Sequence, residues 1–326
     1  MRFYHLLLIL CSSLFVACST DTVTFPYENT LTPKLIPLQG VTFPVRFEVK
    51  QPFLVFQNMK RSDSLFHVYD LRNFELKSAF GEIGQGPGEF VSPYLLQTSF
   101  NDVFIEHIDE KVYRFSISEE GQPLFKEPIR IRHELGAWET NFINDSTYVV
   151  EGKHIFPGLL LLNVNSESPI KSWGYRDVDH LDYYSDPNYG APYANDSRIV
   201  YCYENKKQLD FFDTDLNLIK TVQFKDVPPS DITKEDRKAN YVKGYFGKRY
   251  FYALYFGMSW PEYRETYAGA VLEVFDLDGN PIARYAFDGI CPVNFAVDEE
   301  TFTLYGVGEE GTPEDYMLVY QLTGLS

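Results

Sequence analysis

The feature that most constrains this chain is a strand pattern that recurs six times along its 326 residues. Each copy is an apolar strand that ends in a bulky and a polar residue, followed by a short polar turn and another strand. The copies lie 45 to 63 residues apart and end at Asp70, Ser116, Asn163, Asp213, Asp276 and Gln321. Two further strand candidates precede each copy. One period therefore supplies four strands, which is the content of one propeller blade.

The two ends of the chain predict how such a ring would close. The sixth period stops at Ser326, five residues after Gln321, which leaves no room for an outer strand. We expect the strand-like residues 31–38 to supply it, because this pairing would remove an exposed edge. The predicted fold is all-β: a six-bladed β-propeller of four-stranded antiparallel blades, closed by an N-terminal strand that completes the last blade. A content of 17% aromatic residues fits this fold, because wide gaps between splayed blades need Phe and Tyr.

Residues 1–17 stand apart from the repeats. Arg2 is followed by an apolar run and then by Ala17, directly before Cys18. This pattern is typical of a secretory signal peptide and is too short for a transmembrane helix. The stretch from Phe15 to Cys18 also resembles the lipobox of bacterial lipoproteins, in which the cysteine after the cleavage point carries acyl chains. The other interpretation is an ordinary signal peptide with an incidental cysteine.

The lipobox resemblance implies a location and a membrane partner. Acyl chains at Cys18 would anchor the protein in the cell envelope, and Ser19 resembles the usual sorting pattern for the outer membrane. Residues 18–30 are then a polar tether, and residues 31–326 are the propeller domain. Whether the domain faces the periplasm or the cell surface stays open. The net charge of −17 excludes nucleic acid as a partner, because binding a polyanion requires a basic surface.

Glycine is concentrated between the first two periods, in the segment FGEIGQGPGEFVSPY at residues 80–94. Phosphate binding does not explain it, because the spacing is not GxGxxG and no Lys-Ser/Thr follows. A turn does explain it, since glycine permits positive φ and an aromatic residue can then insert between blades. The residues of this predicted turn motif are Gly81, Gly84, Gly86, Pro87, Gly88 and Phe90.

Combined with the lipobox and the six periods, this segment resembles the NHL-type propeller repeat. It is more closely similar to the TolB-like six-bladed propeller lipoproteins of Bacteroidetes. The resemblance implies the fold, an envelope location and binding roles, and it carries over no catalytic residue.

Candidate metal ligands are few. No two histidines have the HExxH spacing, and the best cation candidates are Asp177, Asp179 and Asp182, for which a charged loop surface is the simpler explanation. The sequences DTDLN at 213–217 and DLDGN at 276–280 lack the glutamate of a calcium loop, so we expect hairpin turns there. The sequence predicts no cofactor. Cys202 and Cys291 are expected to be buried free thiols, although a pairing between them stays open.

The longer connections are expected on one face of the ring, as in a binding face. In a four-stranded meander, the connections between second and third strands and those between blades emerge on the same side. The expected ligand contacts on this face are Trp260, Tyr263, Arg264, Tyr267, Tyr183, Tyr184 and Tyr189. The alternative is that these aromatic residues pack their own loops onto the ring. A short helix opened by Asp231 and capped by Ser230 is also predicted.

Two functions from different classes follow. The first is a binding or interaction module of the cell envelope, with an envelope protein, a peptide or a glycan as ligand. The second is a calcium-dependent, lactonase-like hydrolase or lyase with its site in the central channel. Such an enzyme needs oxygen ligands that converge at the channel. The candidates are scattered along the sequence, which favours a protein that is not an enzyme; they are Glu48, Asn141, Asn195, Asn294 and Asp298.

Overall fold

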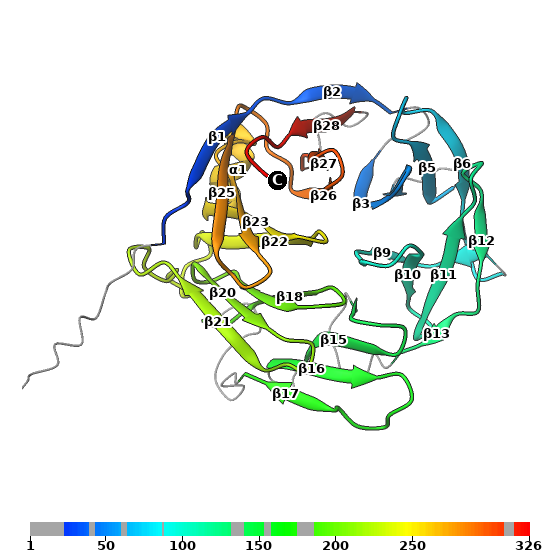
Figure 1. The fold of residues 1–326 in the computed structure, drawn as a ribbon, viewed down its shortest axis with the longest axis horizontal. Helices are drawn as coiled ribbons and strands as arrows, with labels where there is room; N and C mark the ends of the chain where they lie inside the picture. The colour runs from blue at the N-terminus through cyan, green and yellow to red at the C-terminus, as the bar shows by residue number, and fades with distance from the viewer. Residues whose placement is uncertain are drawn as a thin grey trace, which may run out of the picture.

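The chain forms a closed ring of six antiparallel blades around a central axis (Figure 1). The computed structural model describes residues 23–38, 43–59, 64–86, 88–131, 140–152, 158–174, 186–309 and 316–326. Within each blade, successive strands pair antiparallel from the axis outward. The prediction of an all-β, six-bladed propeller is therefore confirmed.

The strands follow the predicted periods. Blade 1 contains β3 (Pro44–Lys50), β4 (Phe53–Asn58), β5 (Phe66–Asp70) and β6 (Leu76–Phe80). Blade 2 contains β9 (Tyr94–Leu96), β10 (Val103–His107), β11 (Lys111–Ile117) and β12 (Pro123–Phe125), with β13 (Ile129–Arg130) also on β11. Blade 3 contains β14 (Asn141–Phe142), β15 (Thr147–Gly152), β16 (Gly158–Asn163) and β17 (Lys171–Trp173).

The second half of the ring has the same order. Blade 4 contains β18 (Gly190–Ala194), β19 (Ile199–Tyr203), β20 (Gln208–Phe212) and β21 (Leu218–Gln223). Blade 5 contains β22 (Ala239–Phe246), β23 (Tyr250–Met258), β24 (Val271–Asp276) and β25 (Pro281–Phe287). Blade 6 contains β26 (Asn294–Asp298), β27 (Thr303–Val307) and β28 (Tyr316–Gln321).

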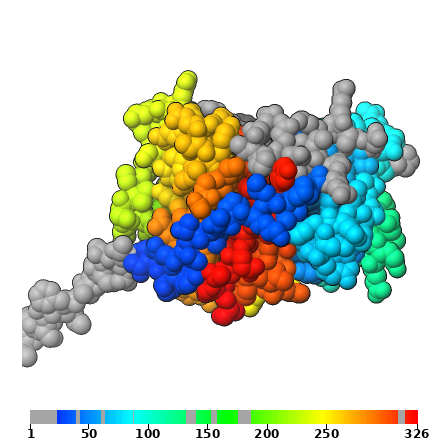
Figure 2. Space-filling view, turned by 90° about the horizontal axis from the view of Figure 1, so that it is seen from above, coloured from blue at the N-terminus to red at the C-terminus, as the bar shows by residue number. Residues whose placement is uncertain are grey.

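The N-terminal segment closes the ring as predicted and also pairs where no pairing was expected. Strand β2 (Lys34–Pro37) lies antiparallel to β28 and is the outer strand of blade 6. Strand β1 (Tyr27–Leu31) adds a fifth strand to blade 5, parallel to β25. The segment runs across the outside of the ring beside the C-terminal residues (Figure 2). Strand pairing begins at Tyr27, inside the residues 18–30 that were predicted as a tether.

Aromatic side chains fill the gaps between blades, as the composition indicated. Phe211 of blade 4 contacts Phe275 of blade 5, with ring centres 6.1 Å apart. Phe90 is 1% exposed and lies edge-on to Phe66 of blade 1 and Tyr113 of blade 2. Each gap is thus closed by rings from both of its walls.

The two aspartate-rich hairpins are turns, as predicted. The Asp213 carboxylate accepts hydrogen bonds from the backbone N–H groups of Asp215 and Asn217. The Asp276 carboxylate does the same for Asp278 and Asn280. Each carboxylate is therefore used inside its own turn. The two cysteines of the described chain, Cys202 and Cys291, are buried free thiols, as expected.

The predicted helix after Ser230 does not form. Residues 230–238 make turns instead: Ser230 Oγ donates to the Lys238 carbonyl, and the Asp231 carboxylate accepts from Thr233 Oγ1. The segment is mostly exposed and has no apolar face to bury, so nothing stabilises a helix there. Over the described ranges, no helix is long and apolar enough to cross a membrane.

Candidate functional site

One face of the ring carries the longer connections, and we call it the loop face. It is the face at which the inner strands β3, β9, β14, β18, β22 and β26 begin. Because strands alternate in direction, the connections from second to third strands and from blade to blade emerge there. The helix of blade 5 and the glycine segment after blade 1 both lie on this face.

Helix α1 (Trp260–Thr266) connects β23 to β24 and is fixed at both ends. Ser259 and Glu262 form a capping box: the Ser259 hydroxyl accepts from the Glu262 N–H, and the Glu262 carboxylate accepts from the Ser259 N–H. Tyr267 ends the helix in the left-handed conformation, with φ at 54°. The side chains of Trp260 and Arg264, four residues apart, therefore leave the helix from one side.

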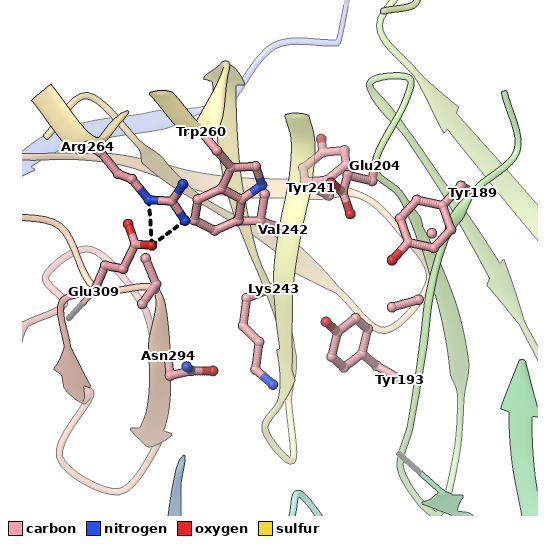
Figure 3. Close-up of a pocket in the computed structure, with 13 residues that line it drawn as sticks. Tyr189, Tyr193, Glu204, Tyr241, Val242, Lys243, Trp260, Arg264, Asn294 and Glu309 are labelled. Carbon is pink, nitrogen blue, oxygen red and sulfur yellow. Dashed lines mark hydrogen bonds and ion pairs between the residues drawn. The ribbon is translucent and has the colours of Figure 1, made fainter. Parts of the chain in front are cut away.

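These two side chains form one wall of a cavity of about 550 Å³ between blades 4, 5 and 6, which we call the aromatic recess (Figure 3). Aromatic and charged groups from different strands line it together. Those used below are Tyr189, Tyr193, Glu204, Tyr241, Lys243, Trp260, Arg264, Asn294 and Glu309. The cavity has the size and the mixture of apolar and polar groups that are common in ligand sites.

The charged side chains of the aromatic recess lie in an ion pair or beside an aromatic ring. Arg264 donates from Nε and Nη2 to Oε1 of Glu309, at 2.8 and 2.6 Å, which joins blade 5 to blade 6. The Lys243 ammonium lies 5.8 Å from the centre of the Tyr193 ring. Burial raises the pKa of the Glu204 carboxyl, an effect that Arg237 and the Trp260 indole oppose. The recess thus contains both signs of charge beside flat apolar surface.

A buried ion pair lies behind the recess and holds one of its rings. The Tyr241 hydroxyl donates to Oε2 of Glu273 at 2.7 Å, and the Lys207 ammonium donates to Oε1 at 2.8 Å. Glu273 is 0% exposed and Lys207 is 6% exposed. The Lys207 ammonium also lies 3.9 Å from the ring centres of Phe224 and Tyr255. Lys207 belongs to blade 4 and Glu273 to blade 5, so the pair connects the two blades.

The raised pKa of Glu204 gives a test of this geometry. We expect the fluorescence of the neighbouring Trp260 to change with a midpoint above pH 4.5, the ordinary pKa of a glutamate side chain. Since the folded chain holds this proton more tightly than the unfolded chain, the carboxyl also adds stability as the pH falls through the same range. A fluorescence titration of Glu204→Gln should lack the transition. Glu262→Gln, which alters a nearby exposed glutamate but keeps the cap, should retain it; loss in both variants would contradict the assignment.

The structure brings together some of the predicted ligand residues and separates others. Trp260, Arg264 and Tyr189 line the aromatic recess. Tyr263 does not face it: the side chain is fully buried and its hydroxyl donates to the Cys291 carbonyl. Tyr267 ends the helix and its carbonyl accepts from the Cys291 N–H. These two tyrosines hold the loop on the ring, which is the alternative that the sequence left open.

The remaining predicted residues lie outside the described ranges. They are Cys18, Pro87, Asp177, Asp179, Asp182, Tyr183 and Tyr184.

Several residues of the recess were not predicted from sequence. Lys243 and Tyr193 lie on inner strands, and Glu204 follows a second strand. Asn294, also on an inner strand, was expected only as a calcium ligand of the channel and not as part of a binding face. Asn294 begins β26 at the loop face and Glu204 follows the end of β19 there, whereas Lys243 and Tyr193 lie within their strands. Single residues of this kind within or beside apolar strands form no pattern that marks a site in the sequence.

Two of the candidate calcium ligands, Glu48 and Asn195, are hydrogen-bonded within the protein. Glu48 accepts from the Lys50 ammonium at 3.0 Å and from the Thr98 N–H at 2.6 Å. Asn195 accepts from the backbone of Ser197 and Arg198 and so holds a turn. In the part of the chain that the structure describes, no three His, Cys, Asp or Glu side chains gather as a metal site requires.

The glycine segment forms a turn and lines a second cavity. Gly81 has φ at +75°, and a side chain at Gly84 would collide with the Glu89 carboxylate, which accepts from the Gly86 N–H. Phe90 inserts between blades 1 and 2, as predicted. The short strands β7 (Glu82–Ile83) and β8 (Glu89–Phe90) pair in parallel across the turn.

The second cavity, of about 520 Å³, lies on the loop face between blades 1 and 2, and we call it the apolar recess. Its apolar lining includes Met59 and Ile83, which are 61% and 56% exposed, beside Leu65 and Phe90. Asn294 lines this recess and the aromatic recess alike.

Comparisons with known proteins concern the fold. No protein-family model and no curated protein matches the chain. Among solved structures, the chain is similar to a member of the DUF4221 family from Bacteroides vulgatus, with 12% identity and a TM-score of 0.56 over 89% of this chain and 97% of that one. It is also similar to the C-terminal WD40 domain of Sif2, with 8% identity and a TM-score of 0.44 over 91% and 100%. At 12% identity, the first likeness shows the propeller fold.

Proposed function

We propose that this protein is a cell-envelope lipoprotein of the TolB-like six-bladed propeller type, which binds a protein, peptide or glycan through its loop face. The observation that carries the proposal is the aromatic recess. Trp, Tyr and Arg are the residues that dominate binding energy at interfaces, and here they converge from blades 4 and 5 on one cavity, which blade 6 completes with Asn294 and Glu309. Ring faces beside paired charges suit a ligand with both apolar and polar groups.

The binding proposal is tested by screening the mature protein against immobilised glycans and a displayed peptide library. Trp260→Ala should weaken binding of a retained ligand about tenfold or more, because a ring that stacks on the ligand is removed. Phe125→Ala, which removes a 52% exposed ring from the outer strand of blade 2, is the matched control and should bind as the wild type does. Equal binding by all three proteins would show that the ligand does not use the recess.

The anchoring proposal rests on Ala17 and Cys18 after an apolar run, and on the start of strand β1 at Tyr27, nine positions after Cys18. Acyl chains on Cys18 would attach the ring to the outer membrane. We expect Cys18→Ala to move the protein from the membrane fraction to the soluble fraction of a bacterial host and to abolish labelling by a fatty-acid analogue. Cys202→Ala, which removes a buried thiol, should leave both unchanged. Membrane retention of Cys18→Ala would contradict the anchor.

A further inference from the structure

The two recesses of the loop face meet at one residue. Asn294, the first residue of β26, lines the aromatic recess between blades 4, 5 and 6 and the apolar recess between blades 1 and 2. The two cavities have similar volumes, about 550 and 520 Å³, and differ in chemistry. A ligand that fills both must therefore be elongated and must cross the ring at Asn294.

The apolar recess is suited to a hydrophobic side chain. Met59 and Ile83 are more than half exposed and, together with the buried Leu65 and Phe90, give the recess an apolar lining that a hydrophobic side chain can cover. Polar side chains that line this recess have partners inside the protein. The Gln57 amide donates to the Pro93 carbonyl and accepts from the Leu95 N–H, Asn58 Oδ1 accepts from the Phe43 N–H, and the Arg46 guanidinium lies 4.5 Å from the centre of the Tyr94 ring. A sugar ring needs polar partners around its edge, and these side chains provide few, so the recess favours an aliphatic or aromatic side chain.

The side chain of Asn294 is suited to a peptide group. A primary amide offers one carbonyl acceptor and two N–H donors, which match the N–H and C=O of a backbone peptide unit. Within the described ranges, the Asn294 side chain makes no hydrogen bond to another protein group, while other asparagines such as Asn195 and Asn240 hold turns and backbone. The amide at the junction of the two recesses is thus available to a ligand.

We propose that the ligand is a polypeptide segment in extended conformation. One apolar side chain fills the apolar recess, the backbone pairs with the Asn294 amide, and a polar or aromatic side chain enters the aromatic recess beside Trp260 and Lys243. Successive side chains of an extended segment point in different directions along a rising backbone, which allows one segment to reach two separate cavities. This inference rests on the proposed binding function of the loop face and specifies its ligand class.

The test uses the full mature protein and a displayed library of linear peptides. Retained peptides are expected to contain a large apolar residue, and their affinity is measured for three variants. Ile83→Asp should weaken binding at least tenfold, because a charge then lies in the apolar recess. Asn294→Ala should weaken it about tenfold through lost hydrogen bonds. Trp260→Ala should also weaken it.

The matched control is Ile170→Asp, which places the same charge at a residue that is 57% exposed, close to the 56% of Ile83, beside the outer strand of blade 3. It should bind as the wild type does. Peptides that depend on Trp260 but not on Ile83 or Asn294 would overturn the two-recess inference and leave the proposed function standing. Retention of glycans and of no peptide would do the same. Failure of every ligand to depend on Trp260 would overturn both proposals.

Discussion

Removal of residues 23–38 is expected to lower the free energy of unfolding by about 5 kcal/mol or more, a large part of the stability of an ordinary domain. The deletion removes β1 from blade 5 and β2 from blade 6, and it opens the ring. It also removes buried apolar groups, since Leu31 and Leu38 are 3% and 6% exposed, and with them the partly buried Phe25, whose ring centre lies 5.6 Å from that of Phe275. Each such side chain contributes about 2–3 kcal/mol, and the strand hydrogen bonds add to this. Urea unfolding followed by circular dichroism measures the change.

Point variants separate closure from a general effect of shortening the chain. Leu31→Ala, at the buried end of β1, should lose about 2–4 kcal/mol. Leu35→Ala, on β2 but 47% exposed, is the matched control and should lose less than about 1 kcal/mol. Unchanged stability of the deleted chain, or equal losses for the two leucines, would mean that the N-terminal strands do not hold the ring together.

The second large effect is expected from Glu273→Leu, which should lower the free energy of unfolding by about 3–5 kcal/mol. The carboxylate of Glu273 is fully buried and accepts from Lys207 and Tyr241. Without it, the Lys207 ammonium is left in a low-dielectric gap between two blades, where burial already lowers its pKa. The rings of Phe224 and Tyr255 also attract the ammonium, but this attraction is much weaker than the one that the Glu273 carboxylate supplied.

A double-mutant cycle distinguishes this explanation from simple misfitting of leucine. Lys207→Met combined with Glu273→Leu removes both buried charges and should recover much of the loss. Arg284, whose Nε lies 3.5 Å from the same oxygen of Glu273, also loses this partner, but its side chain is 37% exposed and stays in contact with water. Lys126→Met, which breaks an ion pair between the more exposed Lys126 and Asp102, should change stability by less than about 1 kcal/mol. Additive losses in the double variant would contradict the role of the buried pair.

The blades could be predicted from sequence because each period contains apolar strand-like segments in the same order. Strand β1 could not, since its sequence YENTL is polar and three of its five residues are exposed. Its pairing with β25 depends on the position of blade 5, which no local pattern encodes. The helix was expected in the wrong place for a related reason. The Ser259–Glu262 capping box is only four residues long, while the charged segment after Ser230 has cap-like residues but no apolar face.

The candidate site was predictable only in part. Trp260, Arg264 and Tyr189 lie in long connections, and such connections gather on one face of any propeller. Lys243, Glu204 and Asn294 are single polar residues in or next to apolar strands, and they meet only because the ring brings blades 4, 5 and 6 around one axis. Tyr263 is an aromatic residue of the same long connection as Trp260 and Tyr267, so the sequence predicts it on the binding face. It lies on the inner side of α1, however, and is buried.

The joint between the two chain ends has a consequence for how the protein is made. Tyr27 and Thr323 share a hydrogen bond although 296 positions separate them. Strands β1 and β2 are synthesised first, yet they cannot pair until β25 and β28 exist, and contacts between such distant residues form slowly. Ring closure is therefore the last step that synthesis permits. A chain that stops before β28 leaves β2 without its partner and exposes strand edges, so only the full-length product hides them from proteases and from other unfinished chains.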